Sequence, residues 1–321
     1  MCGISKSFPG VKALSNVSLT LNTGEVHALC GENGAGKSTL MKILSGVYQA
    51  DEGEIFLNGE KVTIENTKKA QQLGISIIFQ EFNLCPHLSV ANNIWLDRQP
   101  KKGLFVDDKK LIEQTRTILD DLGLSISPKA LVRTLSVAEQ QMVEIAKAIS
   151  FNSKILVLDE PTAALTESEI DRLFNIILKL KLKGVGMIYI SHRLEELARI
   201  TDRVSVLRDG QYIGTYHYKD VKIDNLVHMM VGRELGDKFP VYKRKIGDVL
   251  FEARNIRSNK VNVENIQVRS GEIVGIAGLM GAGRTELARA IFGADKTYHK
   301  EIFVDGKLVT VNSTTSAIKN G

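Results

Sequence analysis

A glycine-rich segment at residues 31–39 has the residue types and spacing needed to bind phosphate groups. It reads G-x-x-x-x-G-K-S and lies between a short apolar run and a helical pattern that ends at Gly46. Glycines let backbone N–H groups wrap phosphates, and the start of a helix favours negative charge. We predict that Lys37 binds the β- and γ-phosphates of a nucleotide and that Ser38 ligates Mg²⁺. The residues expected to line this cradle are Gly31, Glu32, Asn33, Gly34, Ala35, Gly36, Lys37, Ser38 and Thr39.

Two acidic residues, Asp159 and Glu160, follow the apolar run 155–158. A buried strand that ends in carboxylates places them at the edge of an α/β sheet where binding sites form. Asp159 would hold Mg²⁺, and Glu160 would orient or deprotonate an attacking water. Alone, such a pair is more typical of solvated acids. Beside a phosphate cradle, it indicates hydrolysis.

Residues 135–140 read L-S-x-x-x-Q and precede an amphipathic helical pattern. The cradle, this signature, the I-L-V-L-D-E-P-T run and the triplet 191–193 follow one another in an order that resembles the ABC ATPase family. The resemblance covers nearly the whole first unit and implies an α/β fold, ATP and Mg²⁺. It also implies that Ser136 binds the γ-phosphate of ATP held on an opposing domain. Ser136 is equally suited to cap the following helix, and we expect both roles.

The resemblance assigns three further residues. Gln80 matches a glutamine near Mg²⁺ and the membrane-subunit interface, and His192 matches a histidine that contacts the γ-phosphate. Phe8 stands where the family places an aromatic that stacks on adenine, although a core phenylalanine is nearly as plausible. The expected catalytic residues are then Glu160, His192 and Gln80, and the expected metal ligands are Ser38, Gln80 and Asp159.

The chain contains an internal repeat, because residues 24–62 align without gaps onto residues 271–309. The second segment keeps the cradle glycines but has Arg284 where the first has lysine. Arginine is a planar fork and lysine a compact point charge, so we expect no hydrolysis at the second cradle. Because the sequence stops at residue 321, we expect a truncated second unit whose partner site is completed by another polypeptide.

These features predict an α/β P-loop ATPase of ABC type with a helical subdomain, followed by a partial second copy. The expected first domain covers residues 1–210, with the helical subdomain at about 86–150. A linker is expected at 211–247 and the second unit at 248–321.

Composition narrows the function classes. The net charge of +5 includes no long basic block, which argues against nucleic acid as a partner. The three scattered cysteines favour a reducing compartment and do not suggest zinc or disulfides. No stretch approaches the length of about 18 apolar residues needed to cross a bilayer. We expect a peripheral protein on the cytoplasmic face of a membrane.

Within the ABC family, residues 8–14, 159–166 and 275–279 look like the ATPases of monosaccharide importers of the ribose, galactose, xylose and allose type. This resemblance implies ATP hydrolysis that energises sugar import, with membrane permease subunits and an extracytoplasmic sugar-binding protein as partners. A second ATPase chain or a homodimer is a further expected partner. The alternatives are a soluble ABC ATPase that acts on ribosomes or DNA, and an inactive remnant that only binds ATP.

Overall fold

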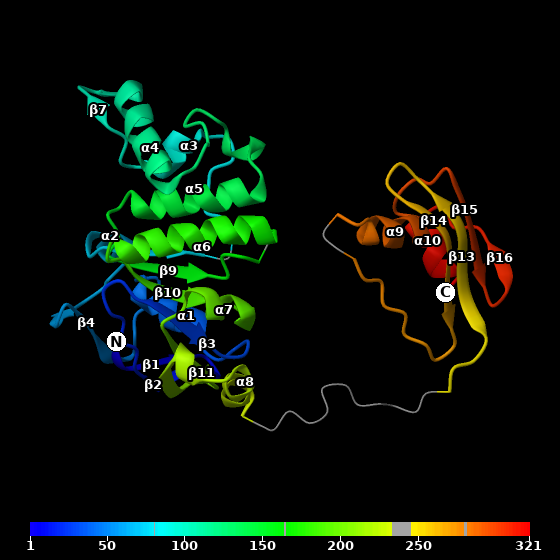
Figure 1. Cartoon of the computed structure of the whole chain (residues 1–321), viewed down its shortest axis with the longest axis horizontal. Coiled ribbons are helices and arrows are strands. Elements are labelled where there is room, and N and C mark those ends of the chain that lie inside the picture. The colour runs from blue at the N-terminus through cyan, green and yellow to red at the C-terminus, as the bar shows by residue number, and fades with distance from the viewer. Residues whose placement is uncertain (80, 164, 233–244, 279–280) are drawn as a thin grey trace. The chain divides into compact units, whose positions relative to one another are not determined.

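The computed structural model describes residues 1–321 except 80, 164, 233–244 and 279–280. The chain divides into two compact units, Met1–Leu235 and Gly236–Gly321. In the first unit, a layer of strands lies between helices, and a further group of helices stands at one end (Figure 1).

A ten-stranded sheet forms the framework of the first unit. Its strand order is β5 (Glu60–Val62), β4 (Glu52–Leu57), β1 (Cys2–Phe8), β2 (Val11–Val17), β12 (Gln211–His217), β11 (Arg203–Arg208), β3 (Val26–Cys30), β10 (Gly186–Ile190), β9 (Ile155–Asp159), β6 (Ile75–Ile78). The five strands from β11 to β6 are parallel. The strands β1, β2, β4 and β5 are antiparallel. This arrangement confirms the predicted α/β class.

The central strands are buried on both faces, which explains their continuous apolar sequences. Successive side chains of a strand point to opposite faces, so β9 and β10 divide their residues between two cores. Leu156, Leu158 and Tyr189 belong to the core on one face. Val157 and Ile188 belong to the core on the other face. Apolar cores cover both faces of the sheet. Polar functional groups can therefore be placed at the edge where these strands end.

The helices of the first unit are α1 (Lys37–Leu44), α2 (Thr67–Gln72), α3 (Val90–Ile94), α4 (Asp108–Leu122), α5 (Val137–Ile149), α6 (Glu167–Leu182), α7 (Leu194–Ile200) and α8 (Ile223–Val231). A short hairpin, β7 (Lys101–Lys102) and β8 (Phe105–Val106), precedes α4. In Figure 1, α3, α4 and α5 lie together beyond α6. Among the described residues, no helix is both long enough and apolar enough to span a bilayer.

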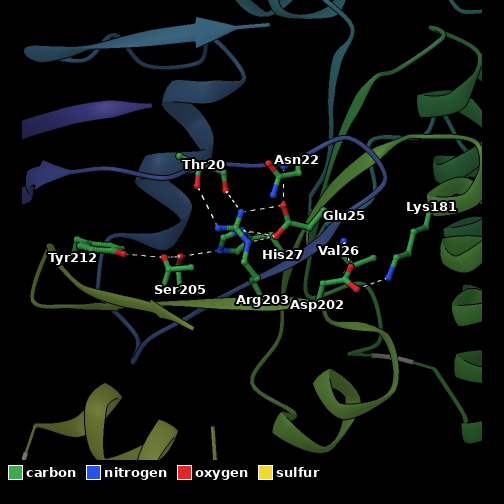
Figure 2. Close-up of polar contacts among 11 residues, drawn as sticks. Thr20, Asn22, Glu25, Val26, His27, Lys181, Asp202, Arg203, Ser205 and Tyr212 are labelled. Carbon is green, nitrogen blue, oxygen red and sulfur yellow. Dashed lines mark hydrogen bonds and ion pairs between the residues drawn. The ribbon is translucent and has the colours of Figure 1, made fainter. Parts of the chain in front are cut away.

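A buried polar network fastens the start of β3 to β11 (Figure 2). Glu25 accepts hydrogen bonds from Nε of Arg203 at 2.6 Å and from Nη2 at 3.0 Å. The fully buried His27 pairs through Nε2 with the hydroxyl of Ser205 at 2.8 Å. Burial raises the pKa of Glu25, but the adjacent His27 imidazole and hydrogen bonds from Arg203 and the Asn22 amide outweigh it and bring the pKa to about 2. This network holds the strand that leads into residues 31–39.

The boundary expected at residue 211 is wrong. Residues 211–217 form β12, which pairs with β11 in the main sheet. Helix α8 follows, and Leu226 is buried in the core of the first unit. Turn residues at 209–210 resemble the start of a linker, but they form the tight turn between two paired strands. The residues 233–244, which belonged to the expected linker, lie outside the described residues.

The second unit contains a four-stranded antiparallel sheet ordered β14 (Asn262–Arg269), β13 (Val249–Arg257), β15 (His299–Val304), β16 (Lys307–Val309), with helices α9 (Arg284–Ile291) and α10 (Thr314–Lys319). When residue 271 is aligned with residue 24, the bounds of α9, β15, β16 and α10 coincide with those of α1, β4, β5 and α2. Residues 273–277, which align with β3, form no strand, and Ile273 is 76% exposed. No counterparts of β10 and β11 are described in this unit to pair with them.

Candidate active site

Three neighbouring parallel strands, β3, β10 and β9, end at one edge of the sheet. The register pairs Ile190 with Asp159, and Tyr189 with Leu158 and Ala28. The loops that follow these strands therefore begin at the same level, and they carry the predicted cradle, Glu160 and His192. This edge is where open α/β sheets place their ligands.

The cradle turns into α1 through glycine conformations that other residues cannot adopt without strain. Gly36 lies at the start of the helix with φ of +96°, and a Cβ there would lie 2.6 Å from Cδ2 of Leu14. A Cβ on Gly31 would lie 2.3 Å from the carbonyl oxygen of Leu207. The backbone at Gly31 and Gly36 thus packs tightly against neighbouring segments of the chain. A Cβ on Gly34 would meet nothing within 4 Å. These contacts give the physical reason for glycine at positions 31 and 36.

Lys37 is buried and points back into the cradle. Its Nζ donates hydrogen bonds to the carbonyl oxygens of Gly31 at 2.7 Å and Glu32 at 3.0 Å. Burial lowers the pKa of Lys37, and the charges of Glu160 and Asp159 oppose this shift. The ammonium group therefore lies inside the loop as a concentrated positive charge, and the charges of two carboxylates act on it.

Glu160 lies beside His192. The imidazole Nε2 of His192 is 3.3 Å from Oε1 of Glu160, and the His192 backbone N–H donates to Oε2 at 3.5 Å. Burial raises the pKa of Glu160, and the neighbouring His192 opposes the shift. Glu160 also has a left-handed backbone with φ of +52°, an unusual conformation for a residue with a side chain and one found at functional sites.

Asp159 and Ser38 are brought together from different segments. Burial raises the pKa of the Asp159 carboxyl, while Lys37, Lys42, His192 and a hydrogen bond from Ser38 lower it. Carboxylate and hydroxyl oxygens are suitable ligands for Mg²⁺. Among the described residues, Oε1 of Glu160 accepts no hydrogen bond, so an acceptor remains available on the same edge. These residues fit a nucleotide phosphate with its magnesium ion.

Two other predicted residues lie at element ends. Ser136 caps α5, because its hydroxyl accepts from the Glu139 N–H at 3.2 Å while the Glu139 carboxylate accepts from the Ser136 N–H at 2.8 Å. The capping role is confirmed, and the phosphate-binding role stays a prediction. Phe8 is only half-buried, and its ring meets that of Tyr48 edge-on at 5.3 Å between centroids. Phe8 is therefore not a core residue. Gln80 lies outside the described residues.

The sequence motifs do not single out Glu196 or Tyr48, although both contact predicted site residues or their immediate neighbours. Tyr48 has no motif of its own, and only the folded chain brings its ring to Phe8. Glu196 is 5% exposed. It accepts hydrogen bonds from Thr162, two residues after Glu160, and from Ser191, which directly precedes His192. Its only sequence signal is its position four residues after His192 at the start of a helix.

Comparison with known proteins agrees with this geometry. Residues 14–163 match the model of the ABC transporter family. The chain is 54% identical over 320 residues to a protein of Agrobacterium fabrum named as a ribose/galactose/methyl galactoside import ATP-binding protein. That alignment covers 99% of this chain and 63% of the relative. The chain is thus similar over residues 14–163 to the ABC transporter family, and over nearly its whole length to sugar import ATP-binding proteins.

A second relative and a solved structure show the same similarity. The galactose/methyl galactoside import ATP-binding protein of Clostridium perfringens is 48% identical over 323 residues, covering 100% of this chain and 63% of the relative. The chain thus spans less than two thirds of the length of these curated relatives. Among solved structures, the ATP-binding cassette MJ1267 in its ADP conformation superposes with a TM-score of 0.64 at 29% identity, covering 72% of this chain and 97% of the cassette.

Proposed function

We propose that this protein binds and hydrolyses ATP to energise the import of a simple sugar through an ABC transporter. The observation that carries the proposal is the convergence of Lys37, Asp159, Glu160 and His192 at one sheet edge. The names of the similar proteins, which are sugar import ATP-binding proteins, support the transport role. They also favour a position on the cytoplasmic face of a membrane.

In the proposed reaction, Lys37 and the N–H groups of residues 31–39 hold the β- and γ-phosphates. Ser38, Asp159 and Gln80 would hold Mg²⁺, which would neutralise charge on the phosphates. Glu160 orients the attacking water and accepts its proton, which requires the ionised carboxylate. His192 contacts the γ-phosphate from the neighbouring strand end, and Phe8 supplies an aromatic face for the adenine.

We propose that residues 248–321 are a second ABC ATPase unit whose cradle does not hydrolyse ATP. The coincident bounds of α9, β15, β16 and α10 with elements of the first unit support this relationship. Gly281 and Gly283 have φ of +82° and +81°, which resemble the +85° and +96° of Gly34 and Gly36. Arg284 is exposed, whereas the aligned Lys37 is buried, so the second cradle lacks the enclosed point charge.

We expect membrane permease subunits as direct partners and an extracytoplasmic sugar-binding protein as an indirect one. A second ATPase chain, or a second copy of this chain, would bring the Ser136 loop of one domain to the ATP of the other. The dimeric structure of the ABC cassette MJ0796, which is 25% identical with a TM-score of 0.58, supports such pairing.

The proposal is tested by reconstituting the protein with its permease in vesicles that enclose ATP. Sugar-binding protein loaded with ribose, galactose or methyl galactoside is added outside. We expect ATP-dependent uptake of one of these sugars, lost in Lys37→Ala and retained in the control Lys61→Ala, an exposed lysine paired with Glu54. Stable ATPase activity without permease association, together with binding to ribosomes or DNA, would favour the soluble alternative and contradict the transport role.

A further inference from the structure

The geometry points to Glu196 as a positioning residue that fastens the loop carrying Glu160 to the loop carrying His192. This inference rests on the proposed ATPase function, because it concerns the placement of the two groups assigned to hydrolysis. Glu196 lies in the first turn of α7 and touches none of the reacting atoms. Its carboxylate is buried at 5% exposure.

One oxygen of Glu196 accepts hydrogen bonds from three hydroxyl groups. The Oε2 atom accepts from Thr162 at 2.8 Å, from Tyr189 at 2.8 Å and from Ser191 at 3.1 Å. The hydroxyls of Thr162 and Tyr189 are buried, and Thr162 is only 1% exposed. We name Thr162, Tyr189, Ser191 and Glu196 the carboxylate latch.

The latch joins segments that are distant in sequence. Thr162 follows Glu160 by two residues, and Ser191 directly precedes His192. Because Oε2 of Glu196 binds both hydroxyls, the loops after β9 and β10 share a single anchor. The Glu160 N–H also donates to the carbonyl oxygen of Ile190 at 2.9 Å, which aligns the two loops at their starts. The distance of 3.3 Å between the Glu160 and His192 side chains depends on this alignment.

Charge at the latch is also balanced. Nη1 of Arg193 donates to Oε1 of Glu196 at 2.9 Å, and Nη2 of Arg193 reaches Glu167 at 3.2 Å. A buried carboxylate is costly unless it is paired and hydrogen-bonded, and here both oxygens have donors. Burial, and then the proximity of Glu196, raise the pKa of Tyr189, so the phenol stays protonated as a donor. Within the described part of the chain, none of these hydrogen bonds joins the latch to residues 31–39, so we expect it to act on the hydrolytic pair and not on the phosphate cradle.

Glu196→Ala removes the carboxylate that accepts hydrogen bonds from the hydroxyls of Thr162, Tyr189 and Ser191. We expect kcat for ATP to fall by about 10- to 100-fold, the range for a displacement of about 1 Å in a catalytic group, while ATP affinity is unchanged. Glu196→Gln keeps an oxygen acceptor for the hydroxyls and loses only the pairing with Arg193, so its kcat is expected between those of the wild type and Glu196→Ala. Tyr189→Phe, which keeps the ring against Phe174, removes one donor and is expected to lower kcat less than Glu196→Ala.

The matched control is Glu195→Ala. Glu195 has the same side chain on the same helix turn, but it is exposed. Its substitution is expected to leave kcat and ATP affinity unchanged. A general loss of folding would instead lower kcat and ATP affinity together, which separates positioning from a merely structural role.

Backbone amide hydrogen exchange on the full chain without nucleotide gives a readout that does not need ATPase activity. We expect Glu196→Ala to speed exchange in residues 160–163 and at the Arg193 amide, which donates to the Ser191 hydroxyl at 3.0 Å. Exchange in residues 31–39 should stay as in the wild type, as it should everywhere in Glu195→Ala. If the wild type fails to hydrolyse ATP in the reconstituted transporter, the proposed function is contradicted while the exchange pattern still tests the latch. Unchanged exchange in both loops, or an unchanged kcat in an active protein, would overturn the inference.

Discussion

The imidazole Nε2 of His192 lies 3.3 Å from Oε1 of Glu160, although the two residues follow different strands of the sheet. Each residue alone is an ordinary side chain at a strand end. Together they place a proton acceptor beside a group that can contact phosphate, next to the buried ammonium of Lys37. Substitutions at single positions test the parts of this arrangement separately.

Lys37→Ala is expected to abolish ATP binding, because it removes the charge that faces the β- and γ-phosphates. The fold should survive, since the lost hydrogen bonds to Gly31 and Glu32 join neighbouring residues of one loop. Calorimetric titration with Mg-ATP measures the affinity, and circular dichroism checks the fold. An unchanged affinity in a folded variant would show that the cradle is assigned to the wrong residues.

Gly36→Ala is expected to weaken both folding and ATP binding. The new Cβ would meet Leu14 and the Ala13 carbonyl at 2.6 and 2.7 Å, and overpacking of this kind costs about 1–3 kcal/mol. The control is Gly10→Ala, where φ is also positive, at +79°, but a Cβ meets nothing within 4 Å. Urea unfolding of both variants isolates the steric contribution. Equal losses in the two variants would rule out the close contact as the reason for glycine.

Much of this site could be predicted because its residues are contiguous in sequence. Residues 31–39 and the run ending at Glu160 bring their structural context with them, since an apolar strand precedes each motif. The capping role of Ser136 is also local, because its partner Glu139 is three residues away.

Features that depend on tertiary contacts could not be predicted in this way. The inward turn of Glu196 depends on hydroxyls from two other loops, and β12 is recognisable only through its pairing with β11. The segment 273–277 repeats the pattern of β3 but forms no strand, because a central strand needs neighbours on both sides. Local propensity does not report whether such neighbours are present.

Glu160→Gln is expected to make the fold more stable at neutral pH. Burial raises the pKa of Glu160 above its unfolded value, so this group stabilises the fold only when protonated, and its contribution is lost as pH rises through the folded pKa. The gain in Tm should therefore be present at pH 8 and should vanish below pH 4, where the ordinary glutamate is protonated. The exposed Glu195→Gln serves as the control and should show no such trend. A gain in Tm that persists at low pH would show that it does not arise from the raised pKa of Glu160.

Glu25→Ala is expected to destabilise the protein by up to about 3–5 kcal/mol at pH 7, because it leaves the half-buried Arg203 without its carboxylate partner and with hydrogen bonds to Thr20 alone. The pKa of Glu25 is lowered to about 2, so its contribution to stability is present above the ordinary value and is lost as pH falls toward 2. Urea unfolding at pH 7 and pH 3 measures the dependence. The free energies of unfolding of the wild type and Glu25→Ala should differ less at pH 3 than at pH 7. An equal difference at both pH values would contradict a stabilising role for the ion pair drawn in Figure 2.

The most direct test of the account is steady-state ATP hydrolysis by Glu160→Gln in an assembly whose wild type turns over ATP. The variant should bind Mg-ATP with wild-type affinity, because Lys37, Ser38 and Asp159 are untouched. Its turnover should fall by about 100-fold or more, the range for losing a positioned base. Turnover of Glu160→Gln at the wild-type rate would contradict the assignment of Glu160 as the base and, with it, the account of hydrolysis at this sheet edge.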